Sequence, residues 1–191
     1  MIVMVLPDPI EDDSLLNRAR RGDKAAMSEI YRLYVESIYQ FCRLRLGDAK
    51  EAEDITGTVF TKFIQELAKG KGPRYHLRGW LFKVARNAIY DSYGKARTLP
   101  IETIEQWEHL DSLHPEQLAF QSIDGEALRD SITMLSPDQQ DVLLLRFDQQ
   151  LSLQETADIL GKNVNTVKAL QLRALKRLRK LLERIGVREY E

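Results

Sequence analysis

The residues best suited to do chemistry lie between Lys162 and Lys180. This segment holds seven Lys or Arg residues and no Asp or Glu. At 100° per residue, its apolar residues form one stripe. An acid-free helix led by small and polar residues suits the major groove, since early turns can reach base edges and later cations can reach phosphates. The residues expected on this DNA-facing side are Asn165, Thr166, Ala169, Leu172, Arg173 and Lys176.

Local signals predict how this helix is held. Ser152 and Glu155 form a capping box, which predicts the start of a preceding helix. Gly161 can end that helix, and Asn163 can cap a second one that runs to about Leu182. The pattern predicts a helix-turn-helix. A plain two-helix hairpin with a solvated basic face would have the same composition. Other parts of the chain must therefore decide between these two interpretations.

A second informative helix is predicted from Leu77 to about Tyr93. Its core side is predicted to carry Leu77, Leu81, Val84, Ala85 and Ala88, with Trp80 at the edge. The opposite side carries Phe82, Lys83, Arg86, Asn87, Tyr90 and Tyr93. Rings interleaved with cations suit single-stranded nucleic acid, where each stacked base contributes about 1–3 kcal/mol. The alternative is that the rings pack within the protein, and for Phe82 the two readings are equally favoured.

Charge is segregated along the chain, although the net charge is only −1. Residues 14–97 carry 17 basic and 9 acidic side chains, a net charge of +8. Residues 98–125 carry six acidic side chains and no Lys or Arg. A basic block next to an acidic connector is typical of a nucleic-acid-binding protein, which the overall isoelectric point would conceal.

The remaining periodicity predicts an all-α fold. Helices are expected over about 14–21, 24–46, 48–68, 77–93, 126–135, 137–147, 153–160 and 164–182. Composition divides the chain into a flexible acidic leader (1–13), in which Pro7 and Pro9 oppose a helix, a first domain (14–97), a flexible acidic linker (98–125) and a helix-turn-helix domain (126–185). The architecture expected is therefore two small helical domains on a linker.

Several kinds of function are not supported by the sequence. It has no phosphate-binding loop, metal-ligand cluster or nucleophile–base spacing, so we expect no enzyme activity, metal or cofactor. No apolar run is long enough for a membrane helix, so we expect no membrane insertion. One cysteine, Cys42, surrounded by apolar residues, favours a buried thiol and a reducing cytoplasm.

Three segments together resemble the extracytoplasmic-function group of sigma factors of bacterial RNA polymerase, in the sigma-70 family. They are residues 52–60 (AEDITGTVF), residues 78–91 (RGWLFKVARNAIYD) and residues 135–168, which contain the helix-turn-helix. Each segment alone is moderately specific, and their order and separations make the resemblance highly specific. It implies a factor that binds core RNA polymerase, recognises promoter DNA as duplex and single strand, and helps to open it. It also implies an anti-sigma factor as a partner.

The resemblance assigns roles by position. The polymerase-binding face would be Asp54, Thr58, Thr61 and Gln65. The minus-ten promoter element would meet Tyr75, His76, Arg78, Trp80, Lys83, Arg86, Asn87 and Tyr90, with Tyr75 and His76 in a loop that holds an extruded base. Lys168 would join the residues that meet the minus-thirty-five element. The acidic linker would lead towards the catalytic cleft of polymerase.

The sequence departs from the family pattern at two places. Gly57 and Thr58 stand where the family usually has Gln and an acid, and Leu170 stands where it often has Arg. The promoter sequence therefore cannot be transferred from other members. Two alternatives stay open: a helix-turn-helix regulator that acts without polymerase, and an interaction module that only binds polymerase.

Overall fold

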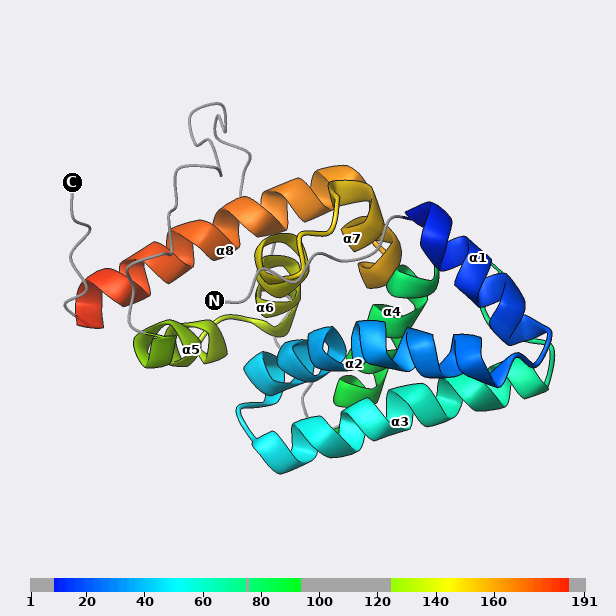
Figure 1. The fold of residues 1–191 in the computed structure, drawn as a ribbon. Coiled ribbons are helices and arrows are strands. Elements are labelled where there is room, and N and C mark those ends of the chain that lie inside the picture. The colour runs from blue at the N-terminus through cyan, green and yellow to red at the C-terminus, as the bar shows by residue number, and fades with distance from the viewer. Residues whose placement is uncertain (1–8, 75, 94–124, 186–191) are drawn as a thin grey trace.

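The computed structural model describes residues 9–74, 76–93 and 125–185. Every regular element in these ranges is a helix (Figure 1). The helices are α1 (Pro9–Arg20), α2 (Lys24–Leu46), α3 (Ala49–Ala68), α4 (Leu77–Ser92), α5 (Gly125–Thr133), α6 (Pro137–Leu143), the π-helix η3 (Leu144–Asp148), α7 (Leu153–Leu160) and α8 (Val164–Ile185). The predicted all-α class is confirmed.

The amino-terminal domain consists of α1 to α4. Asp23 starts α2 by accepting hydrogen bonds from the backbone N–H groups of Ala25 and Ala26, and Asp48 caps α3 in the same way. The apolar sides of α2, α3 and α4 meet in one core, as their spacing predicts. Helical spacing also predicts Tyr31 on the apolar side of α2, but its side chain is half exposed and its ring lies edge-on against Phe60.

Cys42 lies in this core and is fully buried. Burial raises the pKa of its thiol to about 12, because the thiolate would lose its hydration. The predicted burial of this thiol is confirmed.

The carboxy-terminal domain consists of α5 to α8. A regular helix was expected through Phe147, but the chain widens into the π-helix η3 after Leu143. This widening follows a short helix that starts with Pro137 at its first position. Leu144 and Leu145 are buried within η3, and α6, η3 and α7 all contact one another.

The first helix begins earlier than the sequence suggested. Pro9 was expected to oppose a helix, yet α1 starts at this residue. Proline is tolerated in the first helical turn, where its missing N–H would have no partner. Residues 9–13, which were expected in the leader, therefore belong to α1. Residues 1–8 and the segment 94–124 of the expected linker lie outside the described residues.

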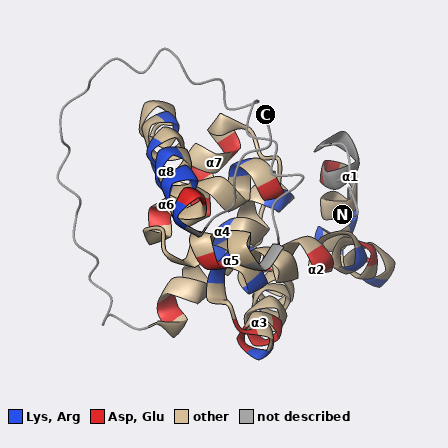
Figure 2. Cartoon of the chain, turned by 90° about the vertical axis from the view of Figure 1, so that its left-hand side faces the viewer, with Lys and Arg blue, Asp and Glu red and all other residues tan. Residues whose placement is uncertain are grey.

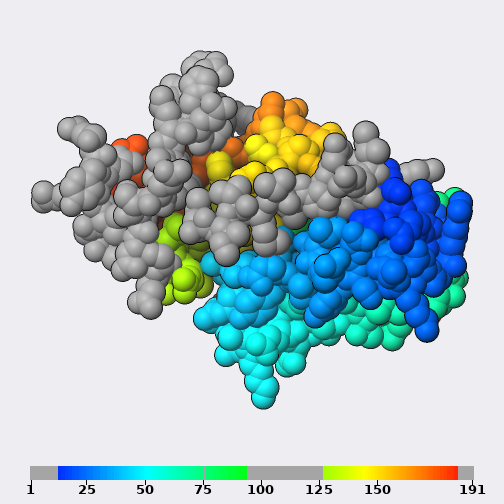
Figure 3. Space-filling model, viewed as in Figure 1, coloured from blue at the N-terminus to red at the C-terminus, as the bar shows by residue number. Residues whose placement is uncertain are grey.

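The two domains are packed against each other. In Figure 3 the yellow-green atoms of α5 lie directly beside the blue atoms of α2. Helix α4 contacts α7, and α2 contacts both α5 and η3. This arrangement brings α4, the predicted strand-binding helix, next to the helix-turn-helix domain.

Candidate nucleic-acid interface

The second helix of the predicted helix-turn-helix is α8. Asn163 caps it by accepting a hydrogen bond from the Thr166 backbone N–H at 2.8 Å. Its predicted apolar stripe is buried as a set: Val167, Leu170, Ala174, Leu178 and Leu181. Of the residues expected to face DNA, four are exposed (Asn165, Lys168, Arg173 and Lys176) and three are half-buried (Thr166, Ala169 and Leu172). Figure 2 shows the Lys and Arg residues distributed along this helix.

The predicted capping box fixes the start of α7, the first helix of the predicted helix-turn-helix. The Ser152 hydroxyl accepts a hydrogen bond from the Glu155 backbone N–H at 3.1 Å, and the Glu155 carboxylate accepts one from the Ser152 N–H at 2.7 Å. Gly161 then ends α7 at a φ of 64°, a left-handed conformation that favours glycine. These two signals set where α7 begins and where it ends.

We expect Ser152→Ala to lower the free energy of unfolding by about 1 kcal/mol, because one N–H at the start of α7 loses its acceptor. Urea unfolding followed by circular dichroism measures the loss. Ser152→Thr keeps the hydroxyl and serves as the control. Equal losses in both variants would show that the hydroxyl does not cap the helix.

The predicted polymerase-binding face lies on α3. Asp54, Thr58, Thr61 and Gln65 are all exposed, and the opposite side of the helix is buried. The Thr58 hydroxyl donates to the Asp54 carbonyl at 2.9 Å, so it stays close to its own helix. This face is accessible to a partner.

Phe82 does not face outwards. It is 0% exposed and its ring meets Phe41 edge-on, with the ring centroids 5.5 Å apart. Helical spacing placed Phe82 beside Lys83 on the outer side, but α4 is covered on more than one side by α2 and α3. The buried apolar arc of α4 is therefore wider than the predicted stripe.

The remaining outer residues of α4 divide into two groups. Lys83 and Asn87 are exposed. Arg86 instead forms ion pairs with the carboxy-terminal domain: its Nε lies 2.7 Å from Asp141 Oδ2 and its Nη2 lies 3.2 Å from Asp138 Oδ1. A residue expected to contact DNA is thus held by two carboxylates of α6.

Asp141 is the centre of this contact. Its side chain is 0% exposed, and its second oxygen accepts from Arg45 Nε of α2 at 2.9 Å. Arg45 also donates to the Gln140 side chain at 2.7 Å. Asp138 forms a further ion pair, at 2.9 Å, with Lys162 in the turn of the helix-turn-helix. We define Arg45, Arg86, Tyr90, Asp138 and Asp141 as the interdomain cluster.

Tyr90 lies within the cluster. Its hydroxyl is 3.3 Å from Asp141 Oδ2, and the guanidinium carbons of Arg86 and Arg45 lie 4.6 Å and 5.7 Å from its ring centroid. The residue is still 36% exposed. Its ring is therefore outside the amino-terminal core, but cations of its own chain already occupy positions over it.

The geometry of the interdomain cluster shifts the pKa values of Arg86 and Tyr90. Burial alone would lower the pKa of Arg86, but the carboxylates of Asp141 and Asp138 raise it above its usual value. Burial and the negative charge of Asp141 raise the pKa of the Tyr90 hydroxyl. Arg86 is therefore cationic and Tyr90 neutral at physiological pH.

A second contact between the domains lies at the start of α4. His76 adopts a left-handed conformation with a φ of 55°, which is uncommon for a non-glycine residue. Arg78 donates to the backbone carbonyl of Gln149. Trp80 is half-buried, with its ring centroid 5.8 Å from that of Phe63. Tyr75, the other predicted loop residue, lies outside the described residues.

Sequence reasoning did not identify Arg45, Asp138 or Asp141 as functional candidates. Asp141 directly precedes the apolar run 142–145. An acid at a position that helical spacing assigns to the core is the available signal, because a buried carboxylate requires a partner.

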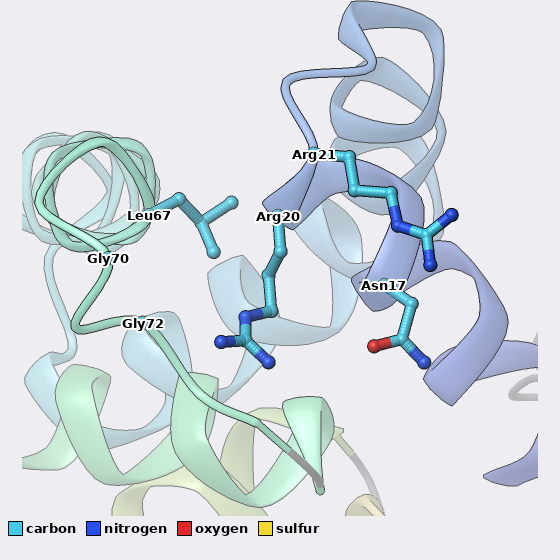
Figure 4. Close-up of a pocket in the computed structure, with 6 residues that line it drawn as sticks. All are labelled: Asn17, Arg20, Arg21, Leu67, Gly70 and Gly72. Atoms are coloured by element: carbon cyan, nitrogen blue, oxygen red, sulfur yellow. The ribbon is translucent and has the colours of Figure 1, made fainter.

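A hollow of about 340 Å³ lies between the end of α1 and the segment that follows α3 (Figure 4). Asn17, Arg20, Arg21, Leu67, Gly70 and Gly72 line it. A side chain could not be added at Gly72 without movement, because its Cβ would lie 2.6 Å from Leu67 Cδ2. Two of the lining residues, Arg20 and Arg21, are cationic, and none of the lining residues belongs to the interdomain cluster.

Within the described helices, none combines the length and low charge needed to cross a bilayer. The same part of the chain contains no group of three or more His, Cys, Asp or Glu side chains suited to a metal ion.

Comparison with known proteins gives consistent matches. Residues 30–98 match the family described as Sigma-70 region 2, and residues 132–180 match Sigma-70 region 4. The ECF RNA polymerase sigma factor SigX of Bacillus subtilis is 30% identical over 160 residues, which cover 81% of this chain and 82% of SigX. The ECF RNA polymerase sigma factor BldN of Streptomyces coelicolor is 32% identical over 170 residues, and the chain spans 64% of its length.

Solved structures show the same fold. The sigma factor RpoE of Bartonella quintana, in complex with the anti-sigma factor NepR, aligns with a TM-score of 0.63 and 24% identity over 82% of this chain and 96% of that chain. CnrH, in complex with the cytosolic domain of CnrY, aligns with a TM-score of 0.68 and 20% identity over 90% of this chain and 97% of that chain.

Proposed function

Because the chain belongs to the extracytoplasmic-function sigma factors of RNA polymerase, we propose that it binds core polymerase, recognises promoter DNA and helps to open the duplex. The observation that carries the proposal is that one chain has two surfaces whose side chains suit DNA. One is the basic and aromatic side of α4, within the region 2 match, and the other is the acid-free face of α8, within the region 4 match.

Each of the two surfaces binds a different promoter element. Helix α8 reads the minus-thirty-five element as duplex, with Asn165, Thr166 and Lys168 in its first turns and Arg173 and Lys176 further along. Leu172 lies on the same side and can contact a thymine methyl group. Base readout by this helix sets the position of the protein on the promoter.

Helix α4 and its preceding loop act on the minus-ten element. Lys83 and Arg86 supply charge for phosphates, Asn87 supplies hydrogen bonds, and Tyr90 offers a ring for stacking. Unpairing a base costs a few kcal/mol, and capture of the exposed base offsets that cost. The loop around His76 is the proposed place for an extruded base.

Polymerase supplies the phosphoryl-transfer chemistry, so the factor itself is not an enzyme. The exposed face of α3 around Asp54 is proposed to dock on polymerase. The factor acts in the cytoplasm, where polymerase and DNA meet. An anti-sigma factor is a proposed partner, supported by the two fold relatives that were solved in complex with other proteins, RpoE with the anti-sigma factor NepR and CnrH with part of CnrY.

Transcription by core polymerase tests the proposal directly. Transcript starts mapped after overexpression identify a promoter, and that promoter is transcribed in vitro with and without the purified protein. Transcription that depends on the protein supports the proposal. Specific duplex binding with no stimulated transcription would instead favour a regulator that acts without polymerase.

We expect Lys83→Ala combined with Lys168→Ala to weaken initiation and to lower the slope of log affinity against log salt by about two, because each phosphate contact contributes about one. Binding of the holoenzyme to promoter DNA at several salt concentrations gives the slope. The control combines Lys24→Ala with Arg129→Ala, which removes one exposed cation from each domain, on α2 and on α5, outside the proposed DNA contacts. The same slope in both variants would refute these contacts.

A further inference from the structure

We propose that the hollow between the end of α1 and the segment after α3 holds one phosphate of the single DNA strand that α4 binds. The proposal rests on the proposed function of α4 and adds the end of α1 to the DNA-binding surface of the amino-terminal domain. The residues that would hold the phosphate are Asn17, Arg20 and Arg21. All three precede residue 30, where the match to Sigma-70 region 2 begins.

The two segments that meet at the hollow carry an excess of positive charge. Residues 17–24 and 66–74 together hold seven Lys or Arg and two acids, a net charge of +5. Both acids already form ion pairs within their own segments, Asp23 at 2.7 Å and Glu66 at 3.1 Å. An anion in the hollow would lower the repulsion among the remaining cations. Among the described residues, the cations of these segments without an acidic partner are Arg20, Arg21, Lys24, Lys71 and Arg74.

The side chains of the α1 wall can converge on a single group. Figure 4 shows the Arg20 side chain extending from α1 towards the segment that follows Gly72, with Asn17 and Arg21 on the α1 side of the hollow. Guanidinium groups bind phosphate through paired N–H donors, and a carboxamide adds a further donor. Asn17, Arg20 and Arg21 are all exposed, so a ligand can reach them from solvent.

The backbone N–H groups of the opposite wall are already used. Gly70 donates its N–H to the Leu67 carbonyl at 2.9 Å. Lys71 and Gly72 donate theirs to the Glu66 carbonyl, also at 2.9 Å. Anion binding is therefore left to the side chains. A Cβ at Gly70 would meet nothing within 4 Å, so this wall leaves room for a strand.

Helix dipoles are the simpler explanation for cations at this place. Both α1 and α3 end at the hollow, and the last carbonyls of a helix favour a nearby Lys or Arg. Each of these helix ends is equivalent to about −0.5 of a charge. Two such ends offset only a small part of the net charge of +5, so a positive excess remains for a ligand.

The hollow is close to the loop proposed to hold an extruded base. Gly72 and His76 are four residues apart, so they are separated by at most about 14 Å. At the spacing of a duplex strand, about 3.4 Å per nucleotide, this distance is at most about four nucleotides. Helix α1 also contacts α4 directly. A strand with one base in the loop can therefore place a neighbouring phosphate in the hollow, and this continuity favours a DNA phosphodiester over a free phosphate ion.

Arg20→Gln combined with Arg21→Gln tests the site in the holoenzyme. The probe is promoter DNA with a duplex upstream part and a single-stranded minus-ten element, in which one phosphate at a time is replaced by an uncharged methylphosphonate. We expect one replacement, within about four nucleotides of the extruded base, to weaken binding of the wild type about tenfold, because charged hydrogen bonds are lost. In the double variant the same replacement should weaken binding less than about twofold, because its partners are already gone.

A second variant and a matched control sharpen the test. Asn17→Asp places a negative charge on the same wall and should also abolish the effect of that replacement. Arg32→Gln combined with Lys50→Gln removes two exposed cations of the same domain away from the hollow and should leave the effect as in the wild type. Circular dichroism verifies that each variant is folded. If every replacement weakens the wild type and the double variant equally, the hollow holds no DNA phosphate and the proposal is wrong.

A thermal unfolding series in inorganic phosphate distinguishes the other source of the anion. Phosphate that stabilises the free wild-type chain but not the double variant, without any coupled DNA linkage, would assign the hollow to free phosphate and overturn the DNA assignment. The result is also separable from that of the proposed function. Wild-type protein that directs transcription but shows no coupled linkage overturns only the phosphate site, whereas a holoenzyme that does not bind the promoter strand overturns both.

Discussion

Phe82→Ala is expected to lower the free energy of unfolding by about 3–5 kcal/mol, because it removes a fully buried ring and leaves a cavity. The ring of Phe82 lies between α4 and α2, where it meets Phe41 at an interplanar angle of 87°. Part of the loss is the edge-to-face contact, which contributes about 0.5–1.5 kcal/mol beyond buried area. Urea unfolding followed by far-ultraviolet circular dichroism measures the effect.

The neighbouring Lys83→Ala is the matched control. Lys83 is exposed, and a surface substitution of this kind changes stability by about 0.5 kcal/mol or less. A similar small effect for Phe82→Ala would mean that the ring is free to leave the core, and Phe82 would again be a candidate for stacking on bases.

Leu178→Ala is expected to lower the free energy of unfolding of the carboxy-terminal domain by about 2–5 kcal/mol. Leu178 is 2% exposed on the apolar stripe of α8, so its loss leaves a cavity under the recognition helix. Promoter binding should fall with stability, because α8 would no longer be held against α6 and α5. Thermal or urea unfolding and a duplex-binding assay measure the two effects.

Leu172→Ala makes the same chemical change on a different side of α8. Leu172 is half-buried and belongs to the proposed DNA face, so we expect a loss of under about 1.5 kcal/mol in stability but a weaker preference for a promoter with thymine at the contacted position. If the two leucine variants were equally stable, the assignment of the two faces of α8 would be wrong.

Local sequence signals predicted most of the helices. The caps formed by Asp23, Asp48, Ser152 and Asn163 each lie at the expected helix start, because a side chain and a nearby backbone N–H determine this geometry without help from the rest of the fold. The predicted apolar stripe of α8 is also buried, because one face of this helix packs against a single core.

The features that the sequence did not predict have a common physical cause. The burial of Phe82 and the ion pairs of Arg86 depend on which helices surround α4, and those neighbours are distant in sequence. Helical spacing identifies one favoured face but not the width of the buried arc. Similarly, Asp141 reaches Arg45 across a sequence separation of 96 residues, a pairing that no local pattern can supply.

The burial of Cys42 has a practical consequence for time-resolved measurements. As the sole cysteine, with a thiol pKa of about 12, it should not compete for maleimide dyes in the folded protein. One surface cysteine introduced into each domain can therefore carry a donor and an acceptor fluorophore in an otherwise unaltered chain. Energy transfer between the two dyes would report the distance between the domains during assembly with polymerase on the millisecond timescale.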